Sequence, residues 1–70
     1  MIDQPNGALA ILRRREVEAR CGLRKSTLYA EIAQGKFPAP VRITRRSVGW
    51  VASEVDEWIA RRIADSRKGA

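Results

Sequence analysis

The chain has 70 residues, which suffice for one small domain but leave little room for a deep catalytic cleft. Its 14 Lys plus Arg residues outnumber its 8 Asp plus Glu residues, and the net charge of +6 favours a polyanionic partner. One cysteine and no histidine exclude an intramolecular disulfide and argue against a zinc site, and no apolar run is long enough to cross a bilayer. We therefore expect a cytoplasmic protein that is not an enzyme and holds no metal or other cofactor.

The N-terminal residues carry no periodic apolar pattern. Pro5, Asn6 and Gly7 interrupt the first ten residues, so we predict a flexible tail over residues 1–11. The folded domain is expected to span residues 12–64, and a second flexible tail is expected over residues 65–70.

The first helix is predicted over Arg14–Cys21. Val17 and Cys21 lie four residues apart and face the core, where Cys21 is interpreted as a small buried apolar residue. Gly22 is expected to end this helix, because glycine permits the sharp turn into the next one.

A second helix is predicted from Lys25 to Gln34. Leu28 and Ile32 form its inner face, and Gly35 follows where a left-handed C-terminal cap is least costly. Two short helices joined by a tight turn predict a helix-turn-helix.

A β-hairpin is predicted after the second helix. Pro38 and Pro40 stop the helix and direct the chain into a strand over Val41–Thr44. Apolar residues then alternate with others on both sides of a polar tip at residues 44–47, which is typical of a half-buried hairpin. The inward positions are expected to be Val41, Ile43, Val48 and Trp50.

The third helix is predicted to begin after Ser53, whose hydroxyl would cap it, and to carry Arg61 and Arg62 near its end. Trp50 and Trp58 fall on the inward sides of their elements, so we interpret both as core residues and not as base-stacking platforms. The apolar face of the helix comprises Val55, Trp58, Ile59 and Ile63.

Positive charge is concentrated on the helix-turn-helix and the hairpin. Residues 24–47 hold six basic side chains and one acid, whereas residues 48–60 hold three acids and no base. A basic block confined to one such unit is the electrostatic footprint of a nucleic acid, with polar side chains at a helix start reaching the duplex. The predicted DNA-binding residues are Arg24, Lys25, Ser26, Thr27, Tyr29, Lys36, Arg42, Arg45, Arg46 and Ser47.

Each of these signals has a structural alternative. Ser26 and Thr27 are also the residue types that cap helices, and Tyr29 fits a half-buried packing position. Arg45 and Arg46 would be ordinary solvated residues in a turn, but no acid between residues 36 and 47 neutralises them.

A run of three arginines precedes the first helix. Arg13, Arg14 and Arg15 stand next to Glu16 and Glu18, so pairing within this segment is at least as well supported as contact with a phosphate. The sequence leaves this choice open.

Five segments in this order and spacing resemble the AlpA family of small phage and prophage regulators, which share an excisionase-like, MerR-like winged-helix fold. The resemblance covers about residues 12–62. Its segments are LRRREVEARCGL (12–23), STLY (26–29), GKFPAPVRI (35–43), RSVGW (46–50) and SEVDEWI (53–59).

The resemblance implies a small, mostly-α (α+β) winged helix-turn-helix of three helices plus a hairpin wing. It implies a sequence-specific double-stranded DNA-binding protein that controls transcription of integrase or other mobile-element genes. Two positions depart from the family's pattern: Arg24 replaces a common serine that would cap the second helix, and Ala30 replaces a common basic residue.

Two alternatives stay open. One is an excisionase-type architectural factor that bends DNA, and the other is a protein-interaction module, such as an antitoxin-like domain, that uses the acidic third helix. The expected partners are double-stranded DNA and, through a weak or DNA-templated association, further copies of the chain. Neither a membrane nor a small-molecule substrate is expected.

Overall fold

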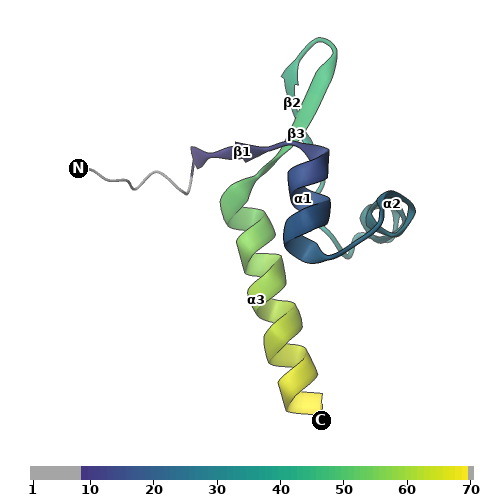
Figure 1. Cartoon of the computed structure of the whole chain (residues 1–70), viewed down its shortest axis with the longest axis vertical. Helices are drawn as coiled ribbons and strands as arrows, with labels where there is room; N and C mark the ends of the chain where they lie inside the picture. The colour runs from purple at the N-terminus through teal and green to yellow at the C-terminus, as the bar shows by residue number, and fades with distance from the viewer. Residues whose placement is uncertain (1–8, 70) are drawn as a thin grey trace, which may run out of the picture.

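A computed structural model describes residues 9–69 of the chain, so the predicted behaviour of residues 1–8 and residue 70 lies outside the described part. Three helices and a three-stranded antiparallel sheet form a winged helix-turn-helix, as predicted (Figure 1). The elements are β1 (Ile11–Leu12), α1 (Arg14–Cys21), α2 (Lys25–Ala33), β2 (Val41–Thr44), β3 (Ser47–Val51) and α3 (Ala52–Gly69).

Glycines in the left-handed conformation end the first two helices. Gly22 has a φ of 68° and donates its N–H to the carbonyl of Glu18 over 2.8 Å, which confirms the predicted end of α1. Gly35 has a φ of 73°, and the next N–H, from Lys36, donates to the carbonyl of Glu31 over 2.9 Å. Helix α2 ends at Ala33, one residue before the predicted end.

The sheet has the order β1-β3-β2 and includes a strand that the sequence pattern does not reveal. β1 pairs with β3 through Ile11 opposite Val51 and Leu12 opposite Trp50. A strand of two residues is too short to show alternation, so the prediction of a flexible tail through residue 11 overlooks it. The register places Leu12 beside Trp50 on the face that packs against the helices.

The core lies between this face of the sheet and the helices. Trp50, Leu28, Val17 and Val55 are fully buried, which confirms their predicted inward positions. Phe37 is also buried, although no periodicity marks it. Further buried core residues are Leu12 and Ala52, while Cys21, Leu23, Ile32, Trp58 and Ile59 pack partly buried against the cluster.

The prediction of a half-buried hairpin is wrong for β2 and for Val48 of β3, which is 42% exposed. All four residues of β2 are exposed, with Val41 at 37% and Ile43 at 42%. The hairpin projects beyond the helices, so only its base, at Gly49 and Trp50, is covered (Figure 1). The side chains of Ile11 and Ile43 lie over Gly49, where a Cβ atom would collide with both.

Helix α3 differs from its prediction at both ends. It begins at Ala52, directly after the last residue of β3, so Ser53 lies inside the helix and does not cap it. Its C-terminal end is Gly69, whereas a flexible tail was expected from residue 65. Arg67 and Lys68 in the last turn favour this extension because cations stabilise the negative end of a helix dipole. The domain limits of 12–64 stay a prediction.

Candidate nucleic-acid interface

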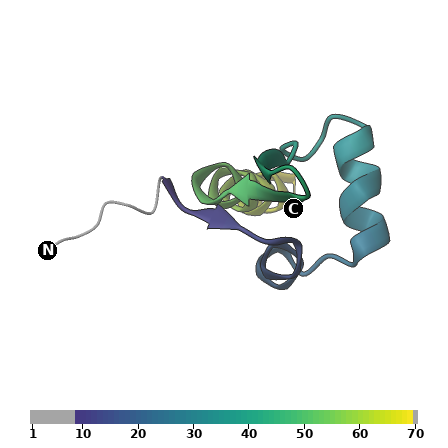
Figure 2. The same ribbon diagram turned by 90° about the horizontal axis from the view of Figure 1, so that it is seen from above.

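Helix α2 stands at one side of the molecule with its outer face exposed (Figure 2). Leu28 holds its inner face in the core, and Ile32 is partly buried beside the same cluster. The outer face carries the small exposed residues Ser26, Ala30 and Ala33. Small side chains allow a helix to approach another surface closely, as entry into a major groove requires.

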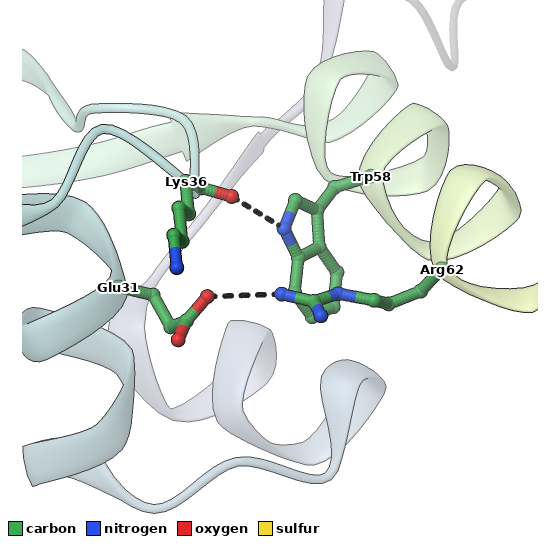
Figure 3. A network of polar contacts seen from close by, with 4 residues as sticks. All are labelled: Glu31, Lys36, Trp58 and Arg62. Carbon is green, nitrogen blue, oxygen red and sulfur yellow. Dashed lines mark hydrogen bonds and ion pairs between the residues drawn. The ribbon is translucent and has the colours of Figure 1, made fainter. Parts of the chain in front are cut away.

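A polar network fixes α2 relative to α3 (Figure 3). The guanidinium of Arg62 lies 4.7 Å from the centre of the Trp58 ring and donates to Oε1 of Glu31 over 2.9 Å. The indole N–H of Trp58 donates to the carbonyl oxygen of Lys36 over 2.8 Å. The one acid of residues 24–47 is therefore paired with α3.

The tip of the hairpin wing is held by its own hydrogen bonds. The hydroxyl oxygens of Thr44 and Ser47 are 2.7 Å apart, and the N–H of Arg46 donates to Oγ1 of Thr44 over 3.3 Å. The Arg42 guanidinium donates to the carbonyl of Arg45 over 3.3 Å. Arg42 thus braces the tip, while the side chains of Arg45 and Arg46 have no hydrogen bond to any described residue.

Three elements meet around a hollow of about 380 Å³, which we call the arginine hollow. Tyr29 of α2 and Arg46 of the wing both line it, so the second helix and the wing share one side of the molecule. Its remaining lining comes from the start of α1 and from β3. The full lining is Arg13, Arg14, Arg15, Tyr29, Arg46, Ser47 and Val48.

The hollow adds Arg13 and Arg15 to the site that the sequence predicts. The Arg14 guanidinium pairs with Glu18 at 3.1 Å, so self-pairing, one of the two alternatives for this run, holds for this residue. Arg13 and Arg15 take part in none of the ion pairs among residues 9–69. The three consecutive arginines in the sequence allowed a contact with phosphate, but only the fold shows that residues 13–15 lie next to the wing.

Two predicted site residues lie elsewhere. Lys36 lines a separate hollow together with Glu54 and Glu57 of α3. Thr27 lines a third hollow, of about 440 Å³, with Leu23 and other residues between the helices. The structure brings together Tyr29, Arg46 and Ser47 in the arginine hollow, while Arg24, Lys25 and Ser26 are exposed at the start of α2.

Comparison with known proteins agrees with this architecture. Residues 10–63 match the family model described as Prophage CP4-57 regulatory protein (AlpA). The chain belongs to the AlpA family. A relative from Enterobacteria phage P4, named Uncharacterized protein ORF88, is 45% identical over 58 residues, which cover 83% of this chain and 66% of the relative. The chain thus spans slightly less than two thirds of that relative's length.

The matching model describes a prophage regulatory protein. Within this AlpA-family chain, the start of α2 shows the consequence of Arg24. No side chain caps the helix and no acid lies in its first turn. The first backbone N–H groups of α2 therefore have no intrahelical or side-chain partner, a state that suits contact with an anion.

Cys21 has no place in this interface. It packs partly buried against the core cluster, and burial raises the pKa of its thiol, an effect that nearby Arg20 opposes and Asp56 adds to. Within residues 9–69 of the AlpA-family chain, no three potential metal ligands gather, and no helix has the length and apolar character needed to span a membrane.

Proposed function

We propose that this AlpA-family chain is a sequence-specific double-stranded DNA-binding regulator of transcription of phage or mobile-element genes. Helix α2 enters the major groove, and the wing contacts the adjacent backbone or minor groove. A cytoplasmic location and the absence of catalysis belong to the same proposal.

One observation carries the proposal. Tyr29 of α2 and Arg46 of the wing line one hollow whose walls contain four arginines and no acid. A single duplex can therefore touch α2 and the wing together, and the arginines match the charge of its phosphates.

The proposed contacts divide by role. Residues at the start of α2 reach base edges and phosphates, those at the wing tip meet the backbone or a narrow minor groove, and Arg42 and Ser47 also shape the wing. Thr27 and Lys36 contact the flanks of the duplex. The contacts are Arg24, Lys25, Ser26, Thr27, Tyr29, Lys36, Arg42, Arg45, Arg46 and Ser47.

Selection of bound fragments from the host genome, followed by footprinting, tests this function directly. We expect one protected sequence at a promoter, with affinity that falls steeply as salt rises, at a slope of about −4 to −5 in log K against log salt for roughly five neutralised phosphates. The charge reversal Arg45→Glu/Arg46→Glu should abolish binding, while Arg67→Glu in the last turn of α3 should weaken it far less.

Other outcomes would point to the alternatives. A protected sequence at an attachment site, with DNA bending in a circular-permutation assay, would indicate an excisionase-type factor. Salt-independent binding, or capture of a protein by the acidic start of α3 without any DNA binding, would contradict the proposal. Asp56 of that acidic surface already pairs with Arg20 at 3.1 Å.

A further inference from the structure

We propose that the arginine hollow is a phosphate clamp, in which Arg13 and Arg15 of the α1 segment and Arg46 of the wing hold one stretch of DNA backbone. The inference rests on the proposed function, because DNA supplies the phosphate. It goes beyond that function by assigning a backbone contact to α1, outside the second helix and the wing.

The charges of the clamp favour an anion. Its lining contains four arginines, and the two acids near it in sequence are both engaged. Glu18 pairs with Arg14, and Oε1 of Glu16 accepts the backbone N–H of Arg13 over 2.9 Å. Of the four guanidinium groups, those of Arg13, Arg15 and Arg46 form no ion pair within residues 9–69.

Packing and hydrogen bonds hold the walls of the clamp beside the arginines. The centre of the Tyr29 ring lies 6.4 Å from that of the fully buried Trp50, which gives the tyrosine a packing partner on its inner side. Ser47 exchanges a hydrogen bond with Thr44, and the N–H of Arg46 is bound to the same Thr44 hydroxyl. A backbone that is already ordered loses less entropy when the site captures a phosphate.

The position of the clamp gives it a role in docking. It lies between Tyr29 of α2 and the wing, so a phosphate held there fixes the distance between α2 and the strand that it approaches. Backbone contacts carry no sequence information but set the register of the reading helix. The clamp should therefore strengthen binding to every duplex and leave the preference among sequences unchanged.

The test compares Arg13→Ala/Arg15→Ala with wild type and with the control Arg67→Ala/Lys68→Ala, which removes equal charge from the last turn of α3. The measured quantity is the slope of log K against log salt. We expect its magnitude to be lower by about one to two in the α1 variant, both on the selected site and on a random duplex. The control should change the slope by less than half as much. Equal thermal melting of the two variants shows that both are folded.

A second measurement uses duplexes with a single uncharged methylphosphonate at each backbone position in turn. One or two positions should weaken wild-type binding by about tenfold, and the same positions should weaken binding of Arg13→Ala/Arg15→Ala, which keeps Arg46, by less than about threefold. Arg15→Lys should keep most of the wild-type response, because it retains the charge.

The outcomes separate the clamp from the proposed function. If Arg45→Ala lowers the slope but the α1 variant behaves like the control, DNA binding stands and the clamp is wrong. If wild type binds no duplex in a salt-dependent way, the proposed function and the clamp both fail.

Discussion

The indole N–H of Trp58 donates a hydrogen bond of 2.8 Å to the backbone carbonyl of Lys36. A second tryptophan makes an analogous bond two residues further along the same loop, where Trp50 donates to the carbonyl of Pro38 over 3.0 Å. The loop between α2 and β2 is thus tied to α3 and to β3 by two indoles. These bonds help to set the position of α2 relative to the wing.

Replacing each tryptophan by phenylalanine should destabilise the fold to different degrees. Trp50 is fully buried, so Trp50→Phe leaves the Pro38 carbonyl short of a donor and leaves a cavity, with an expected loss of about 2–4 kcal/mol. Trp58 is only partly buried, and water can replace its N–H at Lys36, so Trp58→Phe should cost about 1 kcal/mol. Urea unfolding measures both, and a larger loss for Trp58→Phe would contradict the argument.

Arg24→Ser should stabilise the fold and weaken DNA binding at once. Arg24 occupies the N-cap of α2 without a capping hydrogen bond, and a serine there would supply the missing acceptor, with a gain of about 0.5–1 kcal/mol. The lost cation should reduce the salt slope by about one. Arg24→Ala is the matched control, since it removes the charge without adding a cap, and it should show the binding loss alone.

Gly49→Ala should destabilise the wing. The new Cβ atom would collide with Cγ2 of Ile11, lie 2.8 Å from Cδ1 of Ile43 and lie 2.9 Å from the carbonyl oxygen of Leu12. Because one of these neighbours is backbone, β1 must shift, and we expect a loss of about 1–3 kcal/mol in thermal or urea unfolding. Gly69→Ala serves as the control, because nothing lies within 4 Å of its Cβ position. An unchanged free energy of unfolding in Gly49→Ala would show that β1 shifts without cost and would contradict this prediction.

Cys21 should react slowly with alkylating reagents near neutral pH. Burial raises the pKa of the thiol, so at a given pH a smaller fraction is the reactive thiolate than for a free cysteine. The rate should increase with pH and level off only above the ordinary thiol pKa. Iodoacetamide labelling of the native protein, compared with the same protein in urea, measures this difference. Equal rates at pH 8 would contradict it.

Local signals in the sequence predict most of the helix boundaries. Gly22 and Gly35 mark the ends of α1 and α2, because only glycine adopts the left-handed conformation there without strain. The start of α3 could not be predicted in this way. Ser53 is a good capping residue, but α3 begins before it, at Ala52, directly after the end of β3. Tertiary hydrogen bonds, such as that from the N–H of Ala52 to the carbonyl of Ala10, override the local preference.

The candidate site was predictable in composition and less so in arrangement. Tyr29 and Arg46 could be chosen from charge and helix phase, but Arg13 and Arg15 could not, because adjacent glutamates offered local partners. Lys36 shows the converse, since its charge suggests a role beside the wing whereas it lines a different hollow, with residues of α3. The side on which a residue emerges from a loop depends on packing that no local pattern encodes. The exposure of β2 likewise depends on the tertiary fold, because the hairpin projects beyond the helices (Figure 1).

The direct passage from β3 into α3 has a mechanical consequence. Val51 ends the strand and Ala52 begins the helix, so no loop separates the wing from α3. Trp50 and Val55, on either side of this junction, are both fully buried, so we expect the base of the wing and the start of α3 to move as one unit.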